Sequence, residues 1–280
     1  MDGLSFYDET CFASSKLITQ KYSTSFTKGI RAFDKNLRDP IYSIYGFVRT
    51  ADEIVDTFHG FDQQQLLLKF SEDTFEAIKM GISTNPVLQS FQLVVNRYKI
   101  ELDLIKSFLN SMQMDIVGKT FTRREYDSYI YGSAEVVGLM CLKVFCDLDT
   151  DLYNRLKPTA CKLGAAFQKI NFLRDINADF KERGRVYFPE VTFDNFNHEQ
   201  KKAIEQEIAE DFDQALEGIK MLPKSCRLGV YLAFSYFKKL LNKISALPPH
   251  AIRQKRVRVS AAEKFALYIS ALIGQKKFAI

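Results

Sequence analysis

The sequence contains few of the residues on which several common kinds of site depend. It has no tryptophan and only three histidines in 280 residues. Because His59, His198 and His250 lie far apart in the sequence, they offer little material for a histidine-based transition-metal centre or a Ser-His-Asp triad. The five cysteines are odd in number and show no CxxC spacing, which argues against a disulfide framework or a zinc site and fits a reducing cytosol.

Long hydrophobic runs are also missing. No apolar stretch approaches the roughly 18 residues of a membrane-spanning helix, and residues 1–10 lack the basic start and apolar core of a signal peptide. The net charge of +5 is spread along the chain, which does not indicate a nucleic-acid partner. One basic run, 252–260, is either a solvated linker or a surface that meets acidic headgroups or substrate. We therefore expect a cytoplasmic protein, at most peripheral at the inner membrane face.

Glycine-, serine- or proline-rich linkers that could separate domains are absent as well. Apolar residues recur every three or four positions over long segments, whereas the alternating pattern of strands and the NG or DG signals of hairpins are nearly absent. This pattern predicts an all-α fold in which residues 1–280 form a single domain. The expected helices are 5–20, 39–57, 62–80, 86–98, 101–117, 122–147, 151–179, 197–221, 225–246 and 260–275.

Two of the expected helices carry a polar stripe on a largely apolar surface. The first stripe consists of Tyr45, Arg49, Asp52 and Asp56, and the second of Gln168, Asn171, Asp175 and Asp179. At about 100° per residue, the members of each set return to one helix face over three turns. Each stripe therefore ends in two carboxylates that lie one turn apart.

Like charges one turn apart repel each other, at a cost of roughly a few tenths of a kcal/mol. A single pair of this kind usually belongs to a solvated helix face, but two such stripes on amphipathic helices are harder to explain in that way. If the two helices face each other, four carboxylates converge on a cavity. Such hard oxygen ligands suit Mg²⁺ bound together with a phosphate group, and Arg49, Arg183 and Arg185 are suited to phosphate oxygens.

The two stripes resemble the signatures of the squalene/phytoene synthases, which condense prenyl diphosphates head to head and have the isoprenoid synthase fold, with helices surrounding a central cavity. The first signature, an arginine followed by D(D/E)xxD, is matched by Arg49, Asp52, Glu53 and Asp56. The second is matched by Gln168, Asn171, Arg174, Asp175, Asp179, Gly184, Arg185, Tyr187 and Pro189. In the sequence around these motifs and in its short length, the chain is most similar to bacterial phytoene synthases.

Other segments extend the resemblance over almost the whole chain. The stretch YSTSF at 22–26 is similar to a family motif near the diphosphate, and YGSAEVVGLM at 131–140 is similar to a helix that kinks along the cavity. In the second stretch Ser133 and Glu135 replace the usual valine and glycine, and the role of Glu135 stays open. The resemblance implies cavity positions for Phe26, Val137 and Gly138, and Phe234 and Tyr236 are further candidates.

The resemblance also implies roles for the motif residues. Magnesium, for which Mn²⁺ can substitute, would be held by Asp52, Asp56, Asn171, Asp175 and Asp179. The diphosphate would be bound by Ser23, Ser25, Arg49, Gln168, Asn171 and Arg185. The catalytic residues would be the four aspartates together with Tyr45 and Tyr131.

The activity implied is the Mg²⁺-dependent condensation of two geranylgeranyl diphosphates to phytoene, with release of diphosphate and without NADPH. The alternatives are dehydrosqualene or squalene synthesis from farnesyl diphosphate, or a non-catalytic assembly relative. A non-catalytic relative would be expected to lose one or more of the aspartates, and all four are present. A single-substrate terpene cyclase would ordinarily not carry the DxxxD spacing twice.

Overall fold

The protein is a stack of helices in this computed structural model, which describes residues 2–118, 120–189, 191 and 195–278. The elements are α1 (Gly3–Tyr22), α2 (Thr24–Arg31), α3 (Lys35–Asp56), α4 (Gln63–Met80), α5 (Pro86–Tyr98), α6 (Leu102–Val117), α7 (Arg123–Ile130), the π turn η1 (Tyr131–Glu135), α8 (Val136–Cys146), α9 (Thr150–Arg183), α10 (His198–Met221), α11 (Lys224–Ser245), α12 (Pro249–Ile252) and α13 (Ala261–Phe278). The described residues contain no strand, only an isolated parallel bridge between Thr120 and Val186. The all-α prediction is confirmed.

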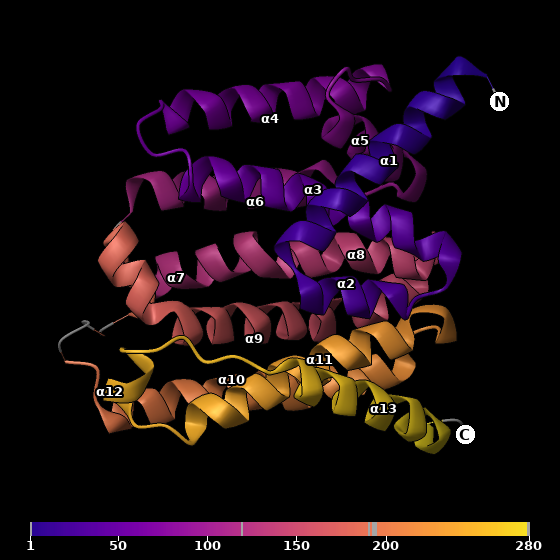
Figure 1. The fold of residues 1–280 in the computed structure, drawn as a ribbon. Helices are drawn as coiled ribbons and strands as arrows, with labels where there is room; N and C mark the ends of the chain where they lie inside the picture. Colours follow the sequence, from indigo (N-terminus) through magenta and orange to yellow (C-terminus); the bar gives the residue numbers. More distant parts are fainter. Residues whose placement is uncertain (1, 119, 190, 192–194, 279–280) are drawn as a thin grey trace.

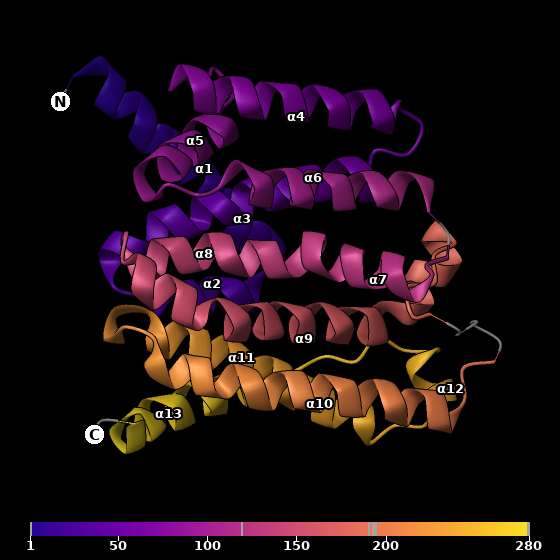
Figure 2. The same ribbon diagram turned by 180° about the vertical axis from the view of Figure 1, so that it is seen from behind.

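The helices are arranged in successive layers (Figures 1 and 2). Helix α4 forms one edge of the molecule, and α10, α11 and α13 form the opposite edge. Helices α3, α8 and α9 lie between these edges, and α8 contacts both α3 and α9. One large cluster of buried apolar side chains extends from Ile30 in α2 to Val257. The two acidic stripes thus belong to helices in the middle of the stack.

All ten expected helices are present, and they differ from the prediction at their ends and, in the helix 122–147, also in the middle. The prediction that a helix begins at residue 39 is wrong, because α3 begins at Lys35 and includes Pro40. Pro40 is the sixth residue of α3, past the first turn, so it removes one backbone hydrogen bond inside the helix; this is why the sequence favours a helix start next to the proline. Two short helices, α2 and α12, were not predicted, since eight and four residues are too few to show a clear helical period.

The expected helix 122–147 is continuous in direction but contains the π turn η1 in its middle. Two glycines allow η1 to lie close to its neighbours. A Cβ atom on Gly132 would lie 2.5 Å from the Ser107 carbonyl oxygen of α6, and one on Gly164 would lie 2.7 Å from the Ala134 carbonyl oxygen. Side chains before and after a π turn are displaced around the axis relative to a regular helix, because the turn contains an extra residue.

The stretch Arg123–Cys146 is also the one described helix that is long and apolar enough to cross a membrane. Half of its most apolar window is buried inside the protein. Contacts with α3, α6 and α9 place α8 among the central helices. Burial within the stack accounts for the apolar character of this helix.

The end of α9 turns the chain back toward α3. Gly184 has φ +65°, the left-handed conformation that favours glycine. The Gly184 amide donates to the Phe180 carbonyl oxygen at 3.0 Å, and the Arg185 amide donates to the Asp179 carbonyl oxygen at 2.9 Å, so that two carbonyl groups at the end of the helix are satisfied. This cap reverses the chain immediately after the second acidic stripe.

Candidate active site

Both acidic stripes line one polar cavity of about 630 Å³. Helix α3 contributes Tyr45, Arg49, Asp52 and Asp56, and helix α9 contributes Gln168, Asn171, Asp175 and Asp179. Ser23 and Ser25 lie in the same wall, where the Ser23 hydroxyl caps α2 by accepting from the Phe26 amide at 3.2 Å. The two stripes therefore face a common space, although they lie more than a hundred residues apart in the sequence.

Arginines neutralise the carboxylates of the first stripe. Arg49 forms ion pairs with Asp52 and Glu53, and its guanidinium lies 4.3 Å from the centre of the Tyr22 ring. Asp56 pairs with Arg185, with 2.9 Å between Oδ1 and Nη1. The side chain of Arg185 is only 7% exposed, so this pair is well shielded from water.

Arginines also flank the second stripe. Asp175 accepts from Arg174 Nε at 2.9 Å, and its Oδ1 lies 2.7 Å from Arg256 Nε. Asp179 is buried, with 8% of the residue exposed. The predicted repulsion between Asp175 and Asp179 is thus offset by cations of the protein itself. Phosphate oxygens could take over the same guanidinium groups.

A network of buried polar groups forms part of the cavity wall, which Asp115, Tyr129 and Tyr187 line. Asp115 accepts from the hydroxyl groups of Tyr129 at 2.6 Å and Tyr187 at 2.8 Å, and it lies 3.6 Å from Arg185. Burial raises the pKa of Asp115 to about 7, and the neighbouring guanidinium and hydroxyl groups oppose this shift. The network fixes the Arg185 side chain, which in turn holds Asp56.

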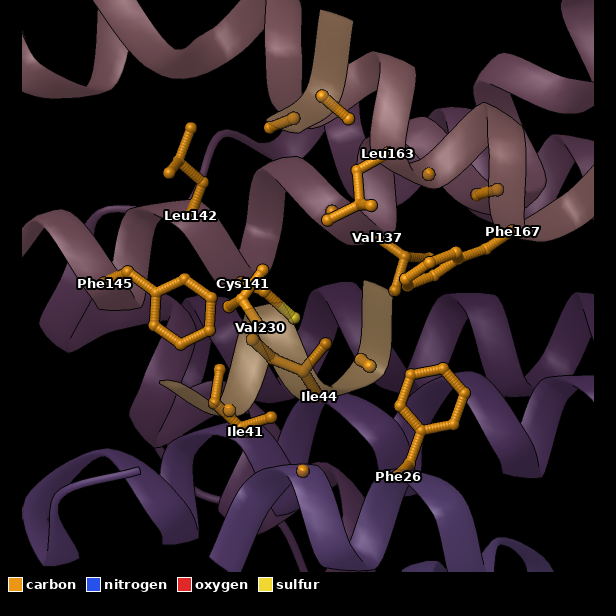
Figure 3. A pocket seen from close by; sticks show the side chains of 18 of the residues that line it. Phe26, Ile41, Ile44, Val137, Cys141, Leu142, Phe145, Leu163, Phe167 and Val230 are labelled. Atoms are coloured by element: carbon orange, nitrogen blue, oxygen red, sulfur yellow. The ribbon is translucent and has the colours of Figure 1, made fainter. Parts of the chain in front are cut away.

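A second, apolar cavity of about 290 Å³ lies beside the polar one. Figure 3 shows its wall, in which side chains of α2, α3, α8, α9 and α11 point toward a common space. Phe145 and Leu142 lie at the end farthest from Phe26. We call this cavity the tunnel. It can hold a hydrocarbon chain, since such sites are lined mainly by apolar and aromatic groups.

The two cavities share four wall residues, namely Phe26, Tyr45, Gln168 and Asn171. The Phe26 ring lies 5.7 Å from the Tyr45 ring and 6.2 Å from the Phe237 ring. Phe237 also stacks on Phe167 of the tunnel at 4.0 Å. Aromatic rings therefore gather where the polar cavity meets the tunnel, and ring faces attract cations.

The structure brings most of the predicted site residues to these cavities. The polar cavity is lined by Ser23, Ser25, Phe26, Tyr45, Arg49, Asp52, Asp56, Gln168, Asn171, Asp175, Asp179 and Tyr236. Val137 and Gly138 line the tunnel. Tyr236 donates its hydroxyl to the Lys264 carbonyl oxygen at 3.2 Å, which ties α11 to the start of α13.

Three predicted residues lie elsewhere. Tyr131 lines neither cavity and is 39% exposed, because the π turn directs Ser133 and Ala134 into the tunnel instead. Phe234 packs edge-on against Phe212 at 5.1 Å, and its neighbour in the chain, Ala233, lines the tunnel. Arg185, expected to bind diphosphate, lies behind the cavity wall and contacts Asp56 rather than open space. Arg183 also followed the second stripe, but its side chain falls outside the described residues.

Several residues of the site were not predicted from the sequence. They are Asp115, Tyr129, Phe167, Arg256 and Phe237. The aromatic residues carry no distinguishing signal, since most rings in a helical protein fill the core. Arg256 belongs to the basic run 252–260, for which contact with substrate was one of the two interpretations. Asp115 interrupts the apolar face of α6. Because a buried carboxylate needs polar partners, its position was a signal from which a polar site could have been predicted.

Ser133 and Glu135 of the π turn, which stand where the family usually has valine and glycine, face in different directions. Ser133 lines the tunnel, and its hydroxyl oxygen has no hydrogen-bond partner among the residues that the structure describes. Glu135 lines a separate polar pocket with Lys162, Lys169 and Asp211, and burial raises its pKa. Glu135 therefore does not point into the tunnel.

The ligands available for a metal ion come in pairs. Among the described residues, no three His, Cys, Asp or Glu side chains are close enough together to hold one ion. Asp52 with Asp56 and Asp175 with Asp179 nevertheless offer hard oxygen ligands in one cavity, together with Asn171. This set fits Mg²⁺, which binds one or two carboxylates and takes its other ligands from water and phosphate.

Comparison with known proteins agrees with this geometry. The phytoene synthase of Arthrospira platensis is 27% identical over 252 residues, covering 81% of this chain and 81% of the relative. The phytoene synthase of Pseudescherichia vulneris is 27% identical over 274 residues, covering 89% and 87%.

Solved structures share the fold. A dehydrosqualene synthase superposes with a TM-score of 0.83 at 21% identity, covering 99% of this chain and 100% of the other. A squalene synthase from Alicyclobacillus acidocaldarius superposes with a TM-score of 0.74 at 19% identity, covering 85% and 94%. The sequence profile named squalene/phytoene synthase matches residues 19–263. With facing acidic stripes, an adjoining tunnel and a profile match over most of its length, the chain belongs to the squalene/phytoene synthase family.

Proposed function

We propose that the protein condenses two allylic prenyl diphosphates head to head and releases both diphosphate groups. The observation that carries this proposal is the arginine- and aspartate-lined cavity that meets an apolar tunnel at a group of aromatic rings. A prenyl diphosphate has the same division, with a charged head and a long hydrocarbon tail. The family to which the chain belongs supports a prenyltransferase of this type.

The polar cavity binds the diphosphates. Arg49, Ser23 and Ser25 donate hydrogen bonds to phosphate oxygens, and Arg174 and Arg256 turn from Asp175 toward the incoming charge. Asp52, Asp56, Asn171, Asp175 and Asp179 would hold Mg²⁺, which would supply Lewis-acid stabilisation of the leaving diphosphate. Arg185 acts from behind the wall by holding Asp56 in place.

The tunnel and the aromatic rings protect the carbocation. One molecule loses diphosphate to give an allylic cation, and the double bond of the second molecule attacks it to form a cyclopropyl intermediate. A second ionisation, rearrangement and proton loss then give a linear polyene. The faces of Phe26, Tyr45 and Phe237 stabilise positive charge near the junction, by roughly 0.5–2 kcal/mol each. The apolar wall excludes water, which would otherwise capture the cation.

We propose geranylgeranyl diphosphate as the substrate and 15-cis-phytoene as the product. The relatives named phytoene synthase support this choice. The second candidate is dehydrosqualene or squalene synthesis from farnesyl diphosphate, which is favoured by the superposition with a dehydrosqualene synthase.

One incubation separates these candidates. Purified protein is supplied with farnesyl or geranylgeranyl diphosphate, with and without Mg²⁺ and NADPH, and the hydrocarbon is identified by mass spectrometry. A C40 triene formed with metal and without NADPH supports the proposal. A C30 product transfers the assignment to the second candidate, and a cyclic product or no hydrocarbon rejects head-to-head condensation.

The role of the aspartates is tested by Asp175→Asn. The substitution keeps the shape of the side chain but removes a charged metal ligand, so turnover should fall at least about 100-fold. The Mg²⁺ concentration for half-maximal activity should rise. Asp73→Asn, which alters an exposed pair with Lys69 on α4, is the matched control and should leave both quantities unchanged.

A further inference from the structure

Arg49 of the first acidic stripe is held on three sides by other groups of the protein. Its Nη1 pairs with Asp52 and its Nη2 with Glu53, and both carboxylates lie on the next turn of α3. The ring of Tyr22, the last residue of α1, lies against the guanidinium, with 4.3 Å between the ring centre and Cζ. Side chains of two helices therefore fix the guanidinium of Arg49.

The packing of α1 on α3 places the Tyr22 ring (Figure 1). A Cβ atom on Gly46 of α3 would lie 2.8 Å from Ser15 Oγ of α1, so the two helices approach closely there. Ser15, Thr19 and Tyr22 follow one face of α1, and the first two are fully buried. Tyr22 ends this face and is 51% exposed, and it lines the polar cavity together with Arg49.

The three partners of Arg49 differ in what else they can bind. Asp52 is one of the carboxylates that would hold Mg²⁺, so it is not a lasting partner of the guanidinium. Glu53 is not among the residues that line the polar cavity, and its side chain is only 16% exposed. The face of the Tyr22 ring attracts the guanidinium without using any of its hydrogen-bond donors. Glu53 and Tyr22 can therefore keep Arg49 in place when Asp52 takes another partner.

One donor of Arg49 is left over. Its Nε is buried and has no hydrogen-bond partner in the part of the chain that the structure describes. Nearly all buried polar groups in native proteins have partners, so an unpartnered donor in a binding cavity points to an acceptor that arrives with the ligand. A phosphate oxygen is such an acceptor, and a guanidinium already fixed in orientation loses little freedom on binding it.

We propose that Tyr22 and Glu53 are positioning residues that hold the Arg49 guanidinium ready for a diphosphate group. We call these two side chains the Arg49 seat. Both act through Arg49 rather than on the reacting carbon atoms. This role rests on the proposed function, in which the polar cavity receives the diphosphates.

NMR spectroscopy of the ligand-free protein tests the geometry of the seat. In protein labelled in its arginine side chains, the Nε–H proton of Arg49 should show the upfield shift of a group that lies over an aromatic ring. The signal is identified by its loss in Arg49→Gln. Tyr22→Phe keeps the ring and should keep the shift, whereas Tyr22→Leu should abolish it. A signal that does not move in Tyr22→Leu overturns the proposal.

Titration calorimetry with inorganic pyrophosphate and Mg²⁺ tests the function of the seat. Tyr22→Leu should bind pyrophosphate about three- to tenfold more weakly than wild type, and Tyr22→Phe should bind as wild type does. Glu53→Gln loses the charge that holds Nη2 and should also weaken binding. The matched control is Phe6→Leu, which removes a 67% exposed ring of the same helix, outside both cavities, and should change nothing.

A double-mutant cycle separates positioning from a general effect on the fold. In protein that already carries Arg49→Gln, Tyr22→Leu should not weaken pyrophosphate binding further, because no guanidinium is left to hold. Equal weakening in both backgrounds overturns the proposal, and so does Tyr22→Leu that binds as the Phe6→Leu control does.

Wild-type protein that binds no pyrophosphate also overturns the proposal. Protein that binds pyrophosphate with the expected differences among the variants, but makes no hydrocarbon from prenyl diphosphates, rejects the proposed function while supporting the seat. Protein that makes hydrocarbon while Tyr22→Leu binds pyrophosphate normally has the opposite meaning.

Discussion

Arg185, which follows the second acidic stripe, donates through Nη1 to Asp56 of the first stripe at 2.9 Å. The two residues are 129 positions apart in the sequence. The same guanidinium donates to the Val55 carbonyl oxygen and to the Tyr187 hydroxyl, both at 3.3 Å. One side chain thus links the ends of both signatures and sets the orientation of Asp56.

Replacing this arginine should damage both stability and turnover. Arg185→Gln leaves the carboxylates of Asp56 and Asp115 without their shared cation, so the free energy of unfolding should fall by roughly 3 kcal/mol. Turnover should fall because Asp56 loses its fixed orientation. Chemical denaturation and steady-state kinetics measure the two effects.

A surface pair provides the comparison for Arg185. Lys69→Gln removes an exposed partner of Asp73 and should change the free energy of unfolding by less than about 0.5 kcal/mol. If Arg185→Gln proves as mild as this control, the linking role assigned to Arg185 is wrong.

The buried carboxyl of Asp115 should make stability depend on pH. Its pKa rises from 3.8 in the unfolded chain to about 7 in the folded protein, because burial disfavours the charged form. Between these values the folded state holds a proton that the unfolded state has released, so the free energy of unfolding falls as pH rises from about 4 to about 7. Denaturation curves at several pH values measure the slope.

Asp115→Asn removes the titrating group and keeps its size. The difference in stability between wild type and variant should therefore change across this pH window, by roughly 2–4 kcal/mol, and stay constant above it. Parallel pH profiles for the two proteins would contradict the assignment.

The two tyrosines near the π turn should behave differently. The Tyr129 hydroxyl donates to Asp115 at 2.6 Å, so Tyr129→Phe leaves a buried acceptor short of a donor and should cost about 1–3 kcal/mol of stability, with reduced turnover. Tyr131 is partly exposed and lines neither cavity, so Tyr131→Phe should leave kcat within about twofold. A large loss of kcat in Tyr131→Phe alone would restore the role that the resemblance implied.

The tunnel should determine which chain length is accepted. The sulfur of Cys141 faces the tunnel between its two ends (Figure 3). Cys141→Phe narrows the tunnel there and should lower kcat/KM for geranylgeranyl diphosphate by at least about tenfold more than for farnesyl diphosphate. Unchanged activity on the shorter substrate shows that the variant is folded, and an equal loss on both substrates would argue against a length-selecting tunnel.

Periodicity predicted the helices because their packing depends on it. Every long helix in the stack buries one apolar face, so the spacing of apolar residues carries the information. The π turn could not be predicted in this way, because it depends on how closely Gly132 and Gly164 approach the carbonyl oxygens of neighbouring helices. The misplacement of Tyr131 follows directly from that missing turn.

The two stripes were predictable because each lies on one helix, where spacing determines which side chains share a face. The partners of the stripes were not predictable, since they come from other elements. Arg185 reaches Asp56 only because Gly184 reverses the chain, and Arg256 reaches Asp175 from a segment 81 residues further along. Contacts of this kind depend on the tertiary fold and leave no local pattern.

Ion pairs between α9 and α10 indicate which part of the molecule moves when ligand binds and which part stays in place. Lys169 is only 6% exposed and forms ion pairs with Glu207 and Asp211 of α10 at 2.5 and 2.6 Å. These pairs fasten the middle of α9 to its neighbour on the side away from the cavity. Asp175 should accordingly keep its place while Arg256, 52% exposed and attached to an irregular segment, turns from Asp175 toward the diphosphate. Closure around the reactants would then come from the chain between α12 and α13, with α9 as the stationary wall.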